Sequence, residues 1–287
     1  YTPGGTVDVL ARLLGPRLTE AWGQPVVIDN RPGAGGNIGA DFVARAAPDG
    51  YTLFLATNAP LTINVAAYQN IKYDPLRDFT PITVAGENPI LLVTNPSLPA
   101  NSVRELIAAA KARPGELTAG TSGLGTTAHL SLAQFNKLAG VEVRHIPYRG
   151  GVPSLTAAVA GEVPMTFSDI VPATPLVREG RLKGLATTGQ RRAGIAPDTP
   201  TMREAGLADF DIVATTWFVA PGGTPKDIVQ KLNREVLRAL NDPEFRGKLR
   251  TMGIDPLGNT PEEAAQFLRQ ELPRWKAIVV EAGIKLE

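Results

Sequence analysis

Residues 25–39 read Pro-Val-Val-Ile-Asp-Asn-Arg-Pro-Gly-Ala-Gly-Gly-Asn-Ile-Gly, an apolar run followed by a glycine-rich loop. The apolar run at 25–28 predicts a buried parallel strand, because strands that are covered on both faces carry continuous apolar residues. The pattern after the loop predicts a helix over 37–47. A strand, a loop and a helix in this order form the repeating unit of α/β proteins.

The same alternation of strands and helices continues along most of the chain. Periodicity predicts strands at 51–56, 90–93, 141–146, 163–167, 182–187 and 212–220, and helices at 7–22, 102–111, 126–138, 154–160, 172–179, 225–240, 243–252 and 261–282. The rhythm restarts between Val93 and Ser102 and changes again near Thr215. We therefore expect an α/β protein of two lobes, residues 1–94 with 219–287 and residues 95–218, each a mixed sheet flanked by helices. Two chain crossings predict a hinge at 93–95 and 215–218.

The composition excludes several classes of protein. The chain has 287 residues, a formal net charge of +1, 43% hydrophobic residues and no cysteine. The near-zero charge and the lack of a basic run argue against nucleic acid as a partner. The missing cysteines exclude disulfides and thiolate metal sites, and no apolar run reaches the roughly 18 residues of a membrane helix. The two histidines, His129 and His145, are too far apart for a local metal motif, so no metal or other cofactor is predicted.

Three glycine-rich loops, at 3–6, 33–39 and 120–127, are typical of ligand loops in an α/β fold. Glycine lets the backbone approach a ligand closely, and the free N–H groups at a helix start favour an anion. In open α/β sheets, ligands lie where such helix starts meet the carboxyl ends of strands. The loops therefore favour anion binding over simple turns, and they predict a carboxylate site that needs no buried lysine or arginine.

Two enzyme alternatives use the loop at 120–127. Gly123-x-Gly125-x-x-Ala128 mimics the dinucleotide fingerprint of an NAD(P)-dependent oxidoreductase, but the acidic residue expected about twenty positions later is missing. A hydrolase would use Ser122 as the nucleophile and His129 as the base, but no orienting acid is visible in the sequence. His129 also fits a simpler role, in which it caps the helix or packs beside the loop.

Three more polar residues are candidates, each with a structural alternative. Asp169 follows a predicted strand, where it would accept hydrogen bonds from a ligand amine, hydroxyl or bridging water, or would cap the next helix. Tyr148 would line a pocket or be an ordinary interfacial aromatic residue. Asp8 lies in the first turn of its helix, where a carboxylate complements the helix dipole.

Short glycine- and proline-rich motifs recur along the whole chain. They include Tyr1-Thr2-Pro3-Gly4-Gly5-Thr6, Asn30-Arg31-Pro32-Gly33-Ala34-Gly35-Gly36-Asn37, Gly120-Thr121-Ser122-Gly123-Leu124-Gly125-Thr126, Pro147-Tyr148-Arg149-Gly150 and Ala220-Pro221-Gly222-Gly223-Thr224-Pro225. Together they resemble the Bug, or TctC, family, the periplasmic solute-binding receptors of tripartite tricarboxylate transporters. The resemblance implies a two-lobed periplasmic-binding-protein fold of the clamshell, type II-like kind, a signal peptide, a location in the periplasm and no catalysis.

The resemblance also implies the ligand and the residues that bind it. Family members typically take small carboxylates, namely dicarboxylates and tricarboxylates, acidic amino acids or aromatic acids, and deliver them to membrane transporter subunits. The carboxylate is expected against Pro3, Gly4 and Gly5 in one loop and against Ser122, Thr126 and Thr127 in another, with His129 close by and Asp169 as the distal contact. Asp8, Tyr148, Thr57 and Asn58 complete the predicted binding set. Loops 57–64 and 168–174 are expected to set selectivity, and the receptor is predicted to be a monomer.

Two features depart from the family pattern. The family usually has a short strand before the Pro-Gly-Gly loop, so we expect that the chain is clipped before Tyr1 and that the first sheet is short of a central strand. The family often has Phe-Asp-Asn where this chain has Phe167-Ser168-Asp169. The acid is thus displaced by one position, which would turn it to the opposite face of the strand.

Overall fold

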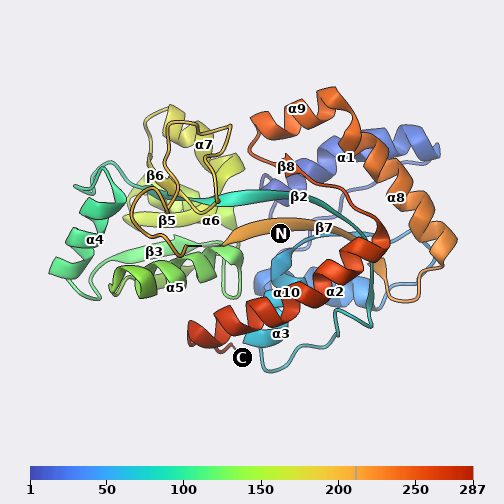
Figure 1. The fold of residues 1–287 in the computed structure, drawn as a ribbon, viewed down its shortest axis with the longest axis horizontal. Helices are drawn as coiled ribbons and strands as arrows, with labels where there is room; N and C mark the ends of the chain where they lie inside the picture. The colour runs from blue at the N-terminus through green and yellow to red at the C-terminus, as the bar shows by residue number, and fades with distance from the viewer. Residues whose placement is uncertain (211, 287) are drawn as a thin grey trace.

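The computed structural model describes residues 1–210 and 212–286. Its elements gather into two groups that are joined by two long strands, β2 and β7 (Figure 1). The strands are β1 (Phe54–Thr57), β2 (Phe79–Thr94), β3 (Thr118–Thr121), β4 (Arg144–Pro147), β5 (Met165–Asp169), β6 (Lys183–Thr187), β7 (Val213–Pro221) and β8 (Asp255–Pro256). The helices are α1 (Thr6–Trp22), η1 (Ala34–Gly36), α2 (Asn37–Ala44), η2 (Ala59–Ile63), α3 (Asn64–Ala67), α4 (Val103–Ala112), α5 (Thr127–Ala139), α6 (Gly151–Ala160), α7 (Ile170–Arg178), α8 (Lys226–Asn241), α9 (Pro243–Thr251) and α10 (Pro261–Glu281).

Strand β2 changes its partners along its length. From Phe79 to Pro89 it pairs antiparallel with β7, and from Ile90 to Thr94 it pairs antiparallel with β5, with β6 on its other side. The sheet order is β1-β7-β2-β5-β3-β4. Because β3 runs parallel to both β4 and β5, the sheet is mixed, as the sequence predicts. The two groups of elements in Figure 1 therefore share one strand whose pairing changes between Pro89 and Ile90.

One apolar cluster packs distant parts of the chain together. It contains Leu92 of β2, Phe135 of α5, Phe167 of β5 and Trp275 of α10, all fully buried. Burial of such side chains contributes about 1.5–3 kcal/mol each. The C-terminal helix is thereby held against elements from the middle of the chain.

Two strand predictions need correction. Residues 25–28 form no strand, because no described residue pairs with them, and the side chain of Val27 is 83% exposed. An apolar run becomes a buried strand only where neighbouring strands hydrogen-bond to its backbone and other elements cover its two faces. This segment and β1 instead line a groove of about 730 Å³. The strand predicted at 90–93 is much longer, since Pro81, Gly86 and Pro89 interrupt its apolar pattern without ending its ladder.

Candidate functional site

The loop before α1 is held in place by Asp8. One carboxylate oxygen of Asp8 accepts a hydrogen bond from the N–H of Gly4 at 2.9 Å, and both oxygens accept from Nε of Arg12 at 3.0 Å. Burial acts to raise the pKa of Asp8, but these hydrogen bonds hold the pKa below its ordinary value. Among residues 1–210 and 212–286 no side chain caps α1, whose N-cap residue is Gly5, so the backbone N–H groups of its first turn are suited to an anion.

The second loop is fixed by two threonine hydroxyls. Oγ1 of Thr121 accepts from the N–H of Gly123 at 3.2 Å, and Oγ1 of Thr126 donates to the carbonyl of Gly123 at 2.8 Å. Thr126 also caps α5 by accepting from the N–H of His129 at 3.3 Å. Gly123 has a φ of 128°, and a Cβ atom there would lie 3.0 Å from the carbonyl oxygen of Tyr148. The loop therefore requires glycine at this position.

His129 and His145 support this loop as a stacked pair. Their ring centroids lie 3.9 Å apart with an angle of 16° between the planes. Nδ1 of His129 accepts from the N–H of Gly125 at 3.3 Å, and Nε2 of His145 lies 2.6 Å from Oγ1 of Thr121. Burial lowers the pKa of His129 to about 3, with a smaller contribution from the charge of His145, and burial lowers the pKa of His145 to about 4. Both rings are therefore neutral near neutral pH.

The two loops meet at a cavity of about 30 Å³. Its lining comes from both groups of elements and consists of Tyr1, Thr2, Gly5, Thr6, Val7, Thr57, Asn88, Ile90, Ser122, Thr126, Thr127, Ala128, Gly151, Asp169 and Ala214. This lining contains no lysine or arginine. One water needs roughly 10–15 Å³ of such space, so the cavity has room for a water or two. A larger ligand requires that the walls of the cavity separate.

Two residues of this lining carry buried polar atoms without a partner. Oγ1 of Thr6 and Nδ2 of Asn88 make no hydrogen bond within the described part of the chain. An unsatisfied buried polar group costs about 1–3 kcal/mol, so a ligand that supplies an acceptor recovers that free energy. The predicted binding set contained neither residue. The available signal for Asn88 is its place in Gly86-Glu87-Asn88-Pro89, a polar break between the apolar runs of β2.

Asp169 lies at the end of β5, directly before α7. It is the N-cap residue of α7 by position, as the structural alternative predicts, but its side chain makes no capping hydrogen bond to that helix. It lines the cavity instead, and burial raises its pKa to about 6. In the ladder with β2, Asp169 is opposite Ile90 and Ser168 is opposite Leu91, so the two side chains leave opposite faces of the strand.

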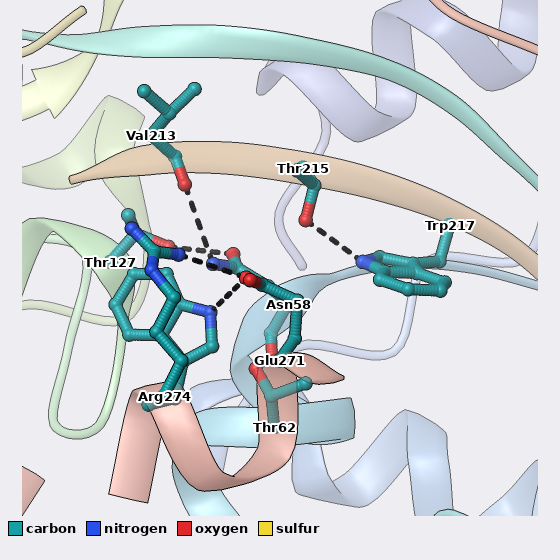
Figure 2. A network of polar contacts seen from close by, with 9 residues as sticks. Asn58, Thr62, Thr127, Val213, Thr215, Trp217, Glu271 and Arg274 are labelled. Atoms are coloured by element: carbon teal, nitrogen blue, oxygen red, sulfur yellow. Dashed lines mark hydrogen bonds and ion pairs between the residues drawn. The ribbon is translucent and has the colours of Figure 1, made fainter. Parts of the chain in front are cut away.

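Residues from the two groups of elements also bond to each other beside the cavity. Oγ1 of Thr127 donates to Oδ1 of Asn58 at 2.9 Å, and Nδ2 of Asn58 donates to the carbonyl of Val213 at 3.5 Å (Figure 2). The hydroxyl of Tyr1 lies 2.7 Å from Oγ1 of Thr57. The Thr127–Asn58 hydrogen bond holds the start of α5 against the segment that follows β1, whereas the Tyr1–Thr57 contact lies within one group and ties the N-terminal residue to the end of β1.

The structure brings half of the predicted binding set to the cavity. The members that line it are Gly5, Thr57, Ser122, Thr126, Thr127 and Asp169. The members outside its lining are Pro3, Gly4, Asp8, Asn58, His129 and Tyr148. The hydrolase alternative fails on geometry, because Nδ1 of His129 faces the Gly125 N–H and the described structure has no hydrogen bond between His129 and Ser122.

Comparison with known proteins now identifies the family. A profile of the tripartite tricarboxylate transporter family receptor, TctC, matches residues 10–284. Protein BugT of Bordetella pertussis is 38% identical over 290 residues, which cover 100% of this chain and 88% of BugT. The chain belongs to the TctC, or Bug, family of receptors. It is therefore a periplasmic solute-binding receptor of the kind that serves tripartite tricarboxylate transporters, and not an enzyme.

Solved structures of the family share the fold of this receptor. MatC from Rhodopseudomonas palustris with bound malate is 36% identical, covers 97% of this chain and 96% of its own, and has a TM-score of 0.89. The structure of R. palustris Rpa4515 with adipate is 39% identical, with coverages of 99% and 95% and a TM-score of 0.96. The predicted α/β periplasmic-binding-protein fold is thus confirmed. Within residues 1–210 and 212–286, no helix is long and apolar enough to cross a membrane.

Proposed function

We propose that this receptor captures a small carboxylate between two lobes and delivers it to a tripartite tricarboxylate-type membrane transporter. The observation that carries the proposal is the cavity where the loops at 3–6 and 120–127 meet. Its lining combines the uncapped start of α1, the Ser122 hydroxyl and the unpartnered donors of Thr6 and Asn88, without any cationic side chain. Neutral donors that are fixed in place stabilise an anion because little reorganisation is needed when it binds.

The ligand class follows from the same donors. A dicarboxylate, an acidic amino acid or an aromatic acid each presents the carboxylate that these donors fit. The relatives that were solved with adipate and with malate support this class. The ligand must be larger than the present cavity of about 30 Å³, so the proposal includes an opening motion.

Opening requires two lobes that separate. We assign residues 1–94 and 219–287 to one lobe and residues 95–218 to the other, with hinge segments at 93–95 and 215–218. The change of partners along β2 supports a division of this kind near its C-terminal end. The hydrogen bond between Thr127 and Asn58 then joins the lobes in the closed form and breaks on opening.

Calorimetry with a panel of small acids tests the capture. We expect one or more acids to bind, and we expect the carboxamide analogue of each to bind at least about tenfold more weakly, because hydrogen bonds to charged groups contribute about 1.5–3 kcal/mol. Ser122→Ala should weaken binding by a similar factor, whereas Thr156→Ala, on the exposed face of α6, should not. Binding of the carboxamides as tightly as the acids would show that the cleft does not recognise a carboxylate.

Uptake into vesicles tests the delivery step. Membrane subunits of a tripartite transporter, reconstituted into lipid vesicles, should take up the labelled acid only when the receptor is added. Uptake that proceeds equally without the receptor would contradict its role in delivery.

A further inference from the structure

We propose that Asp169 makes the cleft selective for acids that carry a hydroxyl or ammonium group close to the bound carboxylate, over the same acids without that group. This inference rests on the proposed function, because it concerns which carboxylates the site accepts. Asp169 is the single acidic residue in the lining of the cavity. Its carboxylate accepts hydrogen bonds, whereas the neutral groups of Thr6, Asn88 and Ser122 can donate them.

The backbone around Asp169 leaves its carboxylate room to face a ligand. Its Oδ2 atom lies near the starts of two helices: a Cβ atom built on Gly5, before α1, would be 3.8 Å away, and one built on Gly151, in α6, would be 3.4 Å away. Glycine at both positions keeps side chains out of this space. The carboxylate therefore occupies the wall of the cavity next to the helix starts that are suited to an anion.

No protein group satisfies this carboxylate. Within the described part of the chain Asp169 has no hydrogen-bond donor and no cation beside it, and burial is the cause of its raised pKa. The nearby phenol of Tyr1 is engaged elsewhere, since its hydroxyl donates to the carbonyl of Gly35 at 3.0 Å and contacts Thr57. The side chain is only partly buried, and a carboxylate that has lost part of its hydration without gaining a partner leaves a role for a ligand donor.

The composition of the lining determines which ligands benefit. An acid whose carboxylate meets Thr6, Asn88 and Ser122 places its adjacent carbon near Asp169, because all four residues line the same cavity. A hydroxyl or ammonium group there donates to Asp169, and an ammonium group also cancels its charge. An unsubstituted chain leaves the carboxylate of Asp169 without a hydrogen-bond donor. A binding site with an unpaired buried polar group rejects the ligand that lacks the partner.

Matched acids of equal carbon skeleton test the inference by calorimetry at neutral pH. The first set is succinate, malate and aspartate, and the second is adipate, 2-hydroxyadipate and 2-aminoadipate. Within a set, we expect the hydroxy or amino acid to bind at least about tenfold more tightly than the unsubstituted acid. Asp169→Asn should reduce this preference to less than about threefold, while Asp198→Asn, at an exposed loop position, should leave it unchanged.

The outcomes separate the inference from the proposed function. If an unsubstituted acid binds the wild-type receptor as tightly as its substituted partners, or if Asp169→Asn keeps the full preference, selectivity does not come from Asp169 although the receptor still binds acids. If no acid of either set or of the wider panel binds, the proposed function fails and the inference fails with it. Asp169→Ser, which also removes the charge, must reproduce the effect of Asp169→Asn, and circular dichroism must show that both variants fold.

Discussion

Acidification should destabilise this receptor through the stacked pair of His129 and His145. In the folded protein Nδ1 of His129 accepts a hydrogen bond, so protonation at that atom breaks the contact with the Gly125 N–H. Protonation of both rings would place two positive charges on rings whose centroids are 3.9 Å apart. Burial, with a smaller contribution from the charge of His145 at His129, keeps both rings neutral and lowers their pKa values to about 3 for His129 and about 4 for His145.

The size of the effect follows from the difference between folded and unfolded pKa values. The pKa of an unfolded histidine is 6.5, so below that pH the unfolded chain binds protons that the folded chain does not. Stability is full above pH 6.5 and falls as the pH drops from there towards 4. At pH 5, which is about 1.5 pH units lower, each histidine costs about 2 kcal/mol and the pair about 4 kcal/mol. Asp169 acts in the opposite sense, because its raised pKa of about 6 makes its cost smaller as the pH falls.

A comparison with His129→Gln/His145→Gln isolates the histidine contribution. Glutamine cannot titrate, and its amide can still hydrogen-bond near the loop, while Asp169 and all other groups titrate equally in both proteins. Urea unfolding followed by circular dichroism at pH 7.5 and pH 5 gives the loss of unfolding free energy for each protein. We expect the wild type to lose about 4 kcal/mol more than the double variant, and each single variant to recover about half. Equal losses in the wild type and the double variant would refute the reasoning.

Three further outcomes follow from the site. Asp169→Asn should raise the unfolding free energy at pH 7.5 by about 3 kcal/mol, because the variant loses the cost of a carboxyl whose pKa is raised from 3.8 to about 6. This gain should nearly vanish at pH 4, where the carboxyl of the folded wild type is protonated. Urea unfolding that shows the same gain at both pH values would contradict this prediction. Gly123→Ala should destabilise the receptor by about 1–3 kcal/mol and weaken acid binding, because this residue has a φ of 128° and its Cβ atom would crowd the Tyr148 carbonyl oxygen. Gly140→Ala, also at positive φ but with open space around it, should leave acid binding unchanged. Calorimetry that shows equal losses of binding in the two variants would contradict this prediction. Thr127→Val should favour the open form, seen as a larger radius of gyration in X-ray scattering without ligand, whereas Thr156→Val should not.

The order of the fold was predictable wherever the signal is local. The helix predicted at 126–138 is found at Thr127–Ala139, and the strand predicted at 182–187 is found at Lys183–Thr187, because hydrophobic periodicity and capping residues lie within each segment. Prediction failed where strand formation depends on partners far away in the chain. Residues 25–28 have an apolar run but no described partner, and the true length of β2 depends on β7, which lies more than a hundred residues later.

The candidate site shows the same division at the level of single residues. The loops at 3–6 and 120–127 could be singled out from the sequence because glycines and hydroxyl residues beside helix starts are local features, and residues of both loops line the cavity; their role as ligand loops stays a prediction. The residues Asp8 and His129 have the chemistry of ligand contacts, yet their hydrogen bonds go to the Gly4 and Gly125 N–H groups, a use that only the folded loop reveals.

Asn88 could not be predicted as a residue of the cavity from the sequence alone. It reaches the cavity because β2 changes partners just after it, between Pro89 and Ile90, and that change depends on strands distant in sequence. In the sequence it is merely a polar residue in a break between apolar runs, and most such breaks are exposed turns. Burial separates the two cases: Asn88 is 2% exposed and its Nδ2 atom has no partner in the described chain. Folding leaves such a donor unsatisfied only at a free-energy cost, and the acid that we propose as ligand would complete its hydrogen bonding.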